Sequence, residues 1–293
     1  MAKLFFHYLI FPGFLFSASV GLIAGWIDRK LTARIQWRLG PPWYQNFVDI
    51  IKLLGKETIL PEEAGPTFIL SPYVGLMASV LVATILGINL FFPYQGFNGD
   101  LIVVLYILVI PAISIIIGAS ASGNPLASVG ASREIKLVLG YELPFILSVS
   151  VAIIKCGGSI QLSSIISHQL DSGSNLISFS GIIAFVVALI CVQAKLGLVP
   201  FDISEAEQEI MAGALIEYSG LLLATIKLTR AMLLYIMPLF LIVLFWAGKL
   251  SPLVLIGKYI VILTITILIK NTNPRLRIDQ ALRFFWGKMT LLA

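Results

Sequence analysis

Seven apolar stretches dominate this sequence, and each is long enough to cross a lipid bilayer as an α-helix. A helix needs about 20 predominantly apolar residues to span the hydrocarbon core. The stretches are approximately Leu4–Ile27, Phe68–Phe92, Leu101–Ala119, Leu137–Ile154, Leu176–Leu198, Gly213–Trp246 and Pro252–Ile269. The sixth is longer than required, which predicts a strongly tilted or broken helix. We therefore expect an all-α fold, a polytopic membrane helix bundle of about seven transmembrane helices.

Composition supports one membrane unit. Hydrophobic residues make up 58% of the chain and charged residues 12%, with a mean hydropathy of +0.98, whereas soluble domains are about one quarter charged. No polar stretch is long enough to form a soluble domain. The first stretch runs into Asp28-Arg29-Lys30, not into a small-residue cleavage site, so we expect a retained span. We expect a single integral membrane domain, 1–293, with cytoplasmic loops 28–66, 120–136, 199–212 and 270–293.

Lys and Arg are unequally divided between the two sets of loops. If the spans alternate, one side has only Lys3, Lys155, Lys249 and Lys258. The other collects Arg29, Lys30, Arg34, Arg38, Lys52, Lys56, Arg133, Lys136, Lys195, Lys270, Arg275, Arg277, Arg283 and Lys288. The positive-inside rule makes this second side cytoplasmic and puts the N-terminus outside the plasma membrane. These basic residues form no stripe with aromatic residues, so we expect no nucleic-acid partner.

Two polar segments carry apolar residues suited to the membrane interface. In the first loop, Pro41-Pro42 precedes a helical pattern in which Phe47, Ile50, Ile51 and Leu54 share a face. This amphipathic helix is expected to lie on the membrane surface, to cover a partner, or both. After Asp279-Gln280 the chain is too short to cross a bilayer. We expect this tail at the cytoplasmic interface, with Phe284, Phe285 and Trp286 as anchors.

One loop concentrates negative charge. The chain has 15 Asp and Glu residues, and five of them are Asp202, Glu205, Glu207, Glu209 and Glu217. A solvated helix face is one interpretation, because a helix N-terminus favours acidic residues. A loop that lies near anionic headgroups has little reason to gather acids without a partner. We therefore favour a partner surface or the mouth of a charged channel.

Four ionisable residues fall within or at the edge of the spans, where each is a functional hypothesis because burial in lipid is costly. They are Glu142, Glu217, Lys227 and Arg230. Snorkelling, or simple pairing of Glu142 with Arg230, is the structural alternative. Pro144 cannot donate to the carbonyl group of Gly140, and this predicts a hydrated polar pocket beside Tyr141 and Glu142. Carboxylates, water and a nearby cation are what a proton path needs.

Bond chemistry is not expected of this chain alone. Cys156 and Cys191 have no CxxC or Cys/His spacing, and His7 and His168 are isolated. No nucleophile–base set, phosphate loop or zinc motif is present. We expect a non-catalytic subunit with no metal or cofactor of its own.

Six motifs in order resemble the complex I subunit 1 family, which includes membrane subunits of formate hydrogenlyase and of energy-converting, membrane-bound nickel–iron hydrogenases. They cover nearly the whole chain. They are Asp28-Arg29-Lys30 with Arg34; Arg38-Leu39-Gly40-Pro41-Pro42 with 49–57; Tyr141-Glu142-Leu143-Pro144; Pro200-Phe201-Asp202 with Glu205-Ala206-Glu207; Glu217-Tyr218-Ser219; and Pro274-Arg275-Leu276-Arg277-Ile278-Asp279-Gln280.

The resemblance implies a subunit at the junction of a peripheral electron-transfer arm and an ion-pumping membrane arm. Its implied partners are an iron–sulfur small subunit and a large catalytic subunit on the cytoplasmic side, and antiporter-like subunits in the bilayer. Iron–sulfur clusters would lie in those partners, where a nickel–iron centre is an open alternative. The implied subunit-interface residues are Asp28, Arg29, Lys30, Arg34, Arg38, Arg275, Arg277 and Asp279. The implied path and coupling residues are Tyr141, Glu142, Asp202, Glu205, Glu207, Glu209, Glu217, Lys227 and Arg230.

Departures from the complex I branch favour the hydrogenase branch. Complex I members usually have Glu-Arg-Lys and Gly-Pro-Asn where this chain has Asp28-Arg29-Lys30 and Gly40-Pro41-Pro42. They also continue into an eighth span after the Asp-Gln motif. In the hydrogenase branch the partner reduces protons or a related acceptor, and no quinone enters.

The sequence therefore predicts a membrane-anchoring and energy-coupling subunit of a hydrogenase-like respiratory complex that translocates H⁺ or Na⁺. A quinone-chamber subunit of a complex I-type NADH or F420H2:quinone oxidoreductase is the alternative within the family. A stand-alone secondary ion transporter is the alternative of another class, although the chain shows no internal repeat.

Overall fold

The computed structural model describes residues 2–92, 96–205 and 207–293, and the side chains of all of these except residues 2–4, 207 and 208. The described residues form helices and turns and contain no strand. Among them, six helical segments are long and apolar enough to cross a membrane, and Phe179–Lys195 is a shorter apolar helix. These seven segments confirm the predicted all-α membrane bundle.

Two of the seven spans consist of two helices in succession. The first contains α1 (Ala2–Leu9) and α2 (Phe14–Ile35), and the third contains α5 (Asp100–Ile107) and α6 (Ile110–Ser120). The other spans are α4 (Pro66–Phe91), α7 (Pro125–Lys155), α9 (Phe179–Lys195), α11 (Gly220–Phe245) and α12 (Pro252–Thr272). The predicted cytoplasmic loop 120–136 is therefore helical from Pro125 onward.

The predicted break in the sixth stretch is wrong in position. α11 is continuous despite Pro238, but it begins only at Gly220. Gly220 has a φ of +51° and Ser219 is extended, so residues 213–219 cannot join the helix and form a separate turn. The third span is broken instead, at Leu108 and Val109, with Pro111 at the second position of α6.

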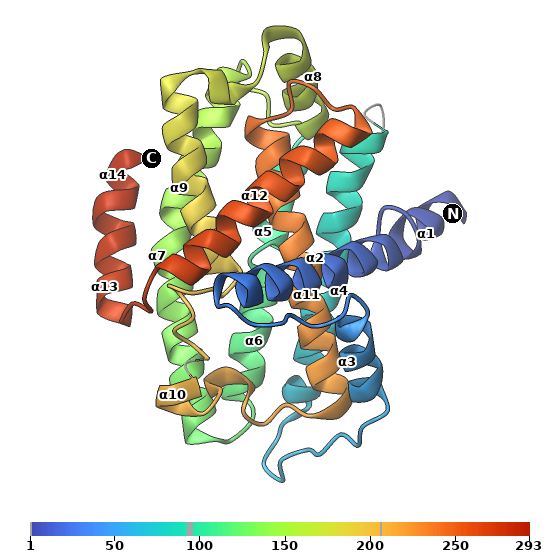
Figure 1. The fold of residues 1–293 in the computed structure, drawn as a ribbon, viewed down its shortest axis with the longest axis vertical. Coiled ribbons are helices and arrows are strands. Elements are labelled where there is room, and N and C mark those ends of the chain that lie inside the picture. The colour runs from blue at the N-terminus through green and yellow to red at the C-terminus, as the bar shows by residue number, and fades with distance from the viewer. Residues whose placement is uncertain (1, 93–95, 206) are drawn as a thin grey trace.

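The bundle is arranged around α11. α4, α7, α9 and α11 run along its long axis, while α2 and α12 cross them obliquely (Figure 1). α11 contacts α2, α4, α9 and α12, and 83% of its most apolar window is buried. A Cβ on Gly21 would overlap the carbonyl group of Ala231. Glycine at this position therefore allows α2 to cross directly over the backbone of α11.

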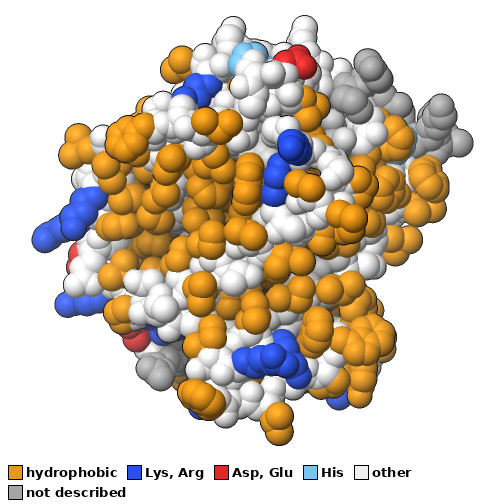
Figure 2. Space-filling view, turned by 45° about the horizontal axis from the view of Figure 1, so that its top comes forward, with side chains coloured by type: hydrophobic (Ala, Val, Ile, Leu, Met, Phe, Trp, Pro, Cys, Tyr) orange, Lys and Arg blue, Asp and Glu red, His pale blue; other side chains and the backbone are white. Residues whose placement is uncertain are grey.

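The outside of the bundle is apolar over a broad area. Apolar side chains cover much of the face shown in Figure 2, with Lys and Arg mainly toward its margins. Exposed residues on the long spans include Ile102, Ile146, Val186 and Ile260. A surface of this kind suits contact with lipid acyl chains or with other membrane subunits.

The two ends of the bundle differ. The basic end, at the bottom of Figure 1, is formed by residues 36–65 and 196–219, including α3 (Gln45–Leu54) and α10 (Glu207–Ile210). The opposite end carries α8 (Leu162–Ser172). α3 confirms the predicted amphipathic helix. Asn46 is buried and donates a hydrogen bond to the carbonyl of Leu22 at 2.8 Å, which attaches α3 to α2.

The C-terminal segment packs against the side of α7. It comprises α13 (Ile278–Arg283), a π-helical turn (Phe284–Met289) and α14 (Thr290–Leu292). Phe285 is fully buried, with its ring centroid 4.8 Å from that of Phe201. The predicted role of Phe285 as an interface anchor is therefore wrong, because its ring fills the space between α7 and the 199–205 loop. Trp286 is 60% exposed and donates to the carbonyl of Leu139 at 3.2 Å.

Candidate functional site

The deepest charge pair joins α7 to α9. Lys195, the last residue of α9, forms an ion pair with Glu142, and their side chains are 2% and 20% exposed. The Lys195 ammonium also lies 4.7 Å from the ring centroid of Phe145 and 5.1 Å from that of Tyr141. The expectation that Lys195 is an ordinary loop cation is therefore wrong. The alternative pairing of Glu142 with Arg230 is wrong for the same reason.

Two further pairs hold the loop between α9 and α10. Glu205 forms an ion pair with Arg230 of α11, and Asp202 accepts a hydrogen bond from Arg275 at 2.6 Å. The backbone N–H of Leu276 donates to the carbonyl of Pro200 at 3.0 Å. These contacts connect the acidic loop to the central span on one side and to the C-terminal segment on the other.

Glu134 is a member of this site that sequence reasoning does not single out. It lies on α7 beside Ser204 and Arg230. Glu134, Tyr141 and Glu142 are separated by seven and eight residues, which puts them on one side of a helix. This spacing is the available signal, but the flanking Arg133 and Lys136 favour a loop interpretation.

A small polar cavity connects these groups. Its volume is about 40 Å³, which is enough for at least one water molecule. Its polar lining includes Glu134, Tyr141, Lys195, Ser204, Glu205 and Arg230. The cavity fits the predicted hydrated pocket beside Tyr141. We call the set Arg275, Asp202, Arg230, Glu205, Glu134, Lys195 and Glu142 the charged line.

Other predicted path residues lie outside the charged line. Glu217 precedes α11 and accepts a hydrogen bond from Asn124 at 2.5 Å. Glu209 is exposed and pairs with Arg133 at 2.6 Å; the hydrogen bond and charge of Arg133 hold the pKa of Glu209 below its usual value. Lys227 is exposed, so the expected buried charge at this position is wrong. The side chain of Glu207 lies outside the described residues.

A larger cavity of about 390 Å³ adjoins the charged line between α2, α3 and α11. Asp28, Arg29, Asp49, Asp202, Glu205, Lys227, Arg230 and Lys270 all line it. Arg29 pairs with Asp49 at 2.8 Å. Burial alone would raise the pKa of Asp49, but hydrogen bonds from Arg29 and Gln45 and the charges of Arg29 and Lys227 lower it.

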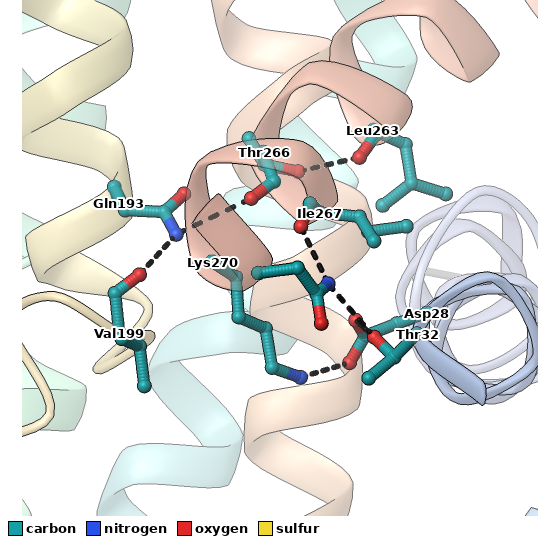
Figure 3. A network of polar contacts seen from close by, with 9 residues as sticks. Asp28, Thr32, Gln193, Val199, Leu263, Thr266, Ile267 and Lys270 are labelled. Carbon is teal, nitrogen blue, oxygen red and sulfur yellow. Dashed lines mark hydrogen bonds and ion pairs between the residues drawn. The ribbon is translucent and has the colours of Figure 1, made fainter. Parts of the chain in front are cut away.

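The first and last long spans are fastened together at the edge of this cavity (Figure 3). Lys270 of α12 pairs with Asp28 of α2 at 2.7 Å, and Asn271 donates to Thr32 at 3.1 Å. On the other side of α12, Gln193 of α9 donates to the carbonyls of Val199 and Thr266 at 2.8 and 3.3 Å. α12 is therefore tied to both neighbouring helices by polar contacts.

The remaining predicted interface residues lie at the basic end. Lys30 donates to the carbonyl of Gly40 at 3.3 Å. Arg34, Arg38, Arg277 and Asp279 are exposed. Beside them, Trp37 and Leu39 are almost completely exposed, at 97% and 102%. Apolar side chains as exposed as these in a polar loop are typical of a protein contact surface.

Metal-binding chemistry finds little support in the described part of the chain. No group of three or more His, Cys, Asp or Glu side chains is arranged to hold a metal ion there. Cys156 and Cys191 are both buried and unpaired, which fits the predicted packing role. The arrangement can hold and relay charge, but it contains no described set of groups suited to breaking a covalent bond.

The fold and the charged line define a class: polytopic membrane proteins that keep paired ionisable groups inside a helix bundle. Comparison with known proteins narrows this class. The NADH dehydrogenase family model matches residues 8–293. The chain therefore belongs to the complex I subunit 1 family.

Individual relatives agree with this family. The chain is 30% identical over 286 residues to the NADH-quinone oxidoreductase H-type membrane chain of Anoxybacillus flavithermus, covering 92% of this chain and 84% of the relative. It is 28% identical to the protein of the same name from Geobacillus kaustophilus, with the same coverage. Among solved structures, a chain of the membrane-bound sulfane sulfur reductase, an archaeal respiratory membrane complex, matches with a TM-score of 0.89 and 32% identity. That match covers 99% of this chain and 97% of the other. The protein is a subunit of a multi-subunit respiratory membrane complex.

Proposed function

We propose that this chain anchors a peripheral redox arm and couples its reaction to H⁺ or Na⁺ translocation in the membrane, in a hydrogenase-like complex. The observation that carries the proposal is the charged line. It begins with Asp202 and Glu205 in a loop at the basic end and reaches the Lys195–Glu142 pair between α7 and α9. Burying ionisable groups in a bundle is costly, so a connected set of them indicates a functional path.

The coupling step would be electrostatic. Arg230 lies beside both Glu205 and Glu134. A movement of the 199–205 loop that separates Glu205 from Arg230 would strengthen the field of Arg230 at Glu134. A change of charge at Glu134 would act in turn, through the small polar cavity, on Lys195 and Glu142. The chain supplies the relay, and the partner subunits supply the electrons.

The proposed partners bind at the basic end, which the positive-inside rule makes cytoplasmic, with the N-terminus outside. Trp37 and Leu39 protrude there, close in sequence to Arg34 and Arg38. We assign this surface to the iron–sulfur small subunit and the large catalytic subunit, which would carry the iron–sulfur clusters and the acceptor-reducing centre. The apolar outer faces of the spans are assigned to lipid and to antiporter-like subunits.

Quinone binding is a second candidate, because the 390 Å³ cavity has the volume of a small-ligand site. Its lining argues against it. Four acidic and four basic side chains border the cavity, whereas a quinone ring and its isoprenoid tail require mainly apolar walls. Reduction of a soluble quinone by the purified complex, blocked by filling this cavity, would favour the second candidate.

The test of the proposal is Glu205→Gln in the complete complex reconstituted in liposomes. We expect partner subunits to co-purify and acceptor reduction to continue, while ion translocation per electron is lost. Asp171→Asn removes an exposed carboxylate at the opposite end and is the matched control, which should retain both activities. Normal translocation by Glu205→Gln would remove the charged line from the coupling path. Ion transport by this chain alone would instead support a stand-alone transporter.

A further inference from the structure

A second buried carboxylate lies at the opposite end of the bundle, far from the charged line in the fold. Asp100, the first residue of α5, is fully buried. Its Oδ1 accepts a hydrogen bond from the backbone N–H of Leu162, the first residue of α8, at 2.7 Å. Its Oδ2 has no hydrogen-bond donor among the described residues. A buried carboxylate oxygen without a donor or a cation is strongly unfavourable.

Asn89 presents a second unsatisfied oxygen to the same place. Its side chain is 2% exposed and lies close to the Asp100 carboxyl group. Its Nδ2 donates to the carbonyl of Ile85 at 3.0 Å, and its Oδ1 has no donor among the described residues. Reversing the amide does not remove the conflict, because Oδ1 would then face the Ile85 carbonyl oxygen.

The backbone of Gly96 marks the point where these oxygens converge. A Cβ built there would overlap Asn89 Oδ1 and would stand 3.0 Å from Ser163 Oγ and 3.4 Å from Asp100 Oδ2. Three oxygens from three elements therefore surround a point that a side chain at position 96 would fill. Hard cations prefer oxygen ligands of this kind.

Nearby basic groups have other partners. The ammonium group of Lys258 donates to the carbonyls of Trp246 and Lys249, both at 2.6 Å. Lys155 donates to the hydroxyl group of Ser178. Within the described residues, therefore, no ion pair is recorded for Asp100.

A polar vestibule gives access to the oxygens. A cavity of about 500 Å³ opens at this end of the bundle, and Asn89 and Ser163 line it together with Gln161, Ser164 and Ser167. Its other walls are Leu90, Ile166, Leu170 and Leu250. The lining contains hydroxyl and amide groups and no basic side chain, so a hydrated cation can approach without electrostatic repulsion.

We propose that Asp100 Oδ2, Asn89 Oδ1 and Ser163 Oγ bind one monovalent hard cation, Na⁺, with water from the vestibule as the remaining ligands. A single carboxylate balances a single positive charge. The charged form of Asp100 is favoured because its Oδ1 accepts an N–H at the first turn of α8 and the residue itself opens α5. A neutral carboxylic acid that donates to Asn89 is the competing arrangement.

The experiment measures equilibrium binding of ²²Na⁺ to the purified complete complex, with choline as the replacement cation, and thermal unfolding under the same conditions. Other subunits can also bind Na⁺, so the informative quantity is a difference between variants. Asp100→Asn keeps the acceptor for Leu162 but removes the charge. Gly96→Ala keeps all three ligands and fills the point between them. Ser167→Ala, in the same vestibule but outside the ligand set, is the control.

We expect Asp100→Asn and Gly96→Ala each to lose one bound Na⁺ per complex, together with the part of the Na⁺-induced rise in Tm that this site supplies. Ser167→Ala should retain both. Unchanged Na⁺ stoichiometry in both variants would overturn the proposal. So would an Asp100→Asn complex that is more stable than the parent in choline and in Na⁺ alike, because that result identifies a neutral acid. Tighter Asp100-dependent binding of Ca²⁺ than of Na⁺ would overturn the assignment to a monovalent ion.

Discussion

The Lys195–Glu142 pair yields the sharpest quantitative prediction. Glu142→Gln leaves the ammonium group of Lys195 without its carboxylate at a position where the side chain is 2% exposed. Removing one partner of a buried pair costs about 3–5 kcal/mol. The glutamine oxygen still accepts a charge-assisted hydrogen bond, which retains about 1.5–3 kcal/mol. The expected net loss in the free energy of unfolding is therefore about 2 kcal/mol.

Lys195→Met should cost less, about 1 kcal/mol, because Glu142 is 20% exposed and keeps some contact with water. The double variant removes both charges and should be no less stable than Glu142→Gln alone. The expected coupling energy is then at least about 1 kcal/mol, within the range for residues in contact. Thermal unfolding of the purified complex measures it, at about 2–4 °C in Tm per kcal/mol. Additive losses in the double variant would refute the pairing.

The same variants separate stability from function. If Glu142 relays charge, the double variant should regain thermal stability relative to the additive expectation but should not regain ion translocation. Ions moved per electron transferred, measured in liposomes, is the relevant quantity. A stable double variant that pumps normally would show that the pair is structural only.

Three further predictions follow from particular contacts. Gly21→Ala should destabilise the subunit by about 1–3 kcal/mol in thermal unfolding, because its Cβ would meet the backbone of Ala231, whereas Gly257→Ala, with nothing within 4 Å, should not. The lowered pKa of Asp49 means that its link to Arg29 is complete above the ordinary value of 3.8 and is lost as pH falls below it; hydrogen exchange of residues 45–54 should therefore be insensitive to this link from pH 8 to 5 and rise below about pH 3.8 in the parent but not in Asp49→Asn. Trp37→Ala should leave the fold unchanged and weaken partner docking at least about 30-fold, as expected for an exposed aromatic hot spot, whereas Trp286→Ala should not; equal co-purification of partners by both variants would exclude Trp37 from the interface.

Periodicity and hydropathy predict the elements well because lipid imposes a simple rule: every span must be apolar and helical. The same rule does not determine where a helix breaks. The interruption at Leu108 and Val109 depends on local packing beside Pro111, and the late start of α11 depends on the positive φ of Gly220. Neither can be inferred from apolar content.

The members of the site are more predictable than their pairing. Asp202, Glu205, Glu142 and Arg230 stand out because charge is rare in this chain. Their partners do not, because Lys195 and Arg275 fit the positive-inside pattern, in which every basic residue near a span end looks alike. Which cation meets which carboxylate is decided by how α7, α9 and the C-terminal segment pack.

The contact between Asp28 and Lys270 links residues 242 positions apart, and both side chains line the 390 Å³ cavity. The wall of this cavity is therefore complete only when α12 has been inserted beside α2. During synthesis, the earlier spans would sit in the membrane with Asp28 unpaired until that late step. Formation of the cavity thus reports that insertion is finished, and a surface that depends on it becomes available to partner subunits only after the last long span is in place.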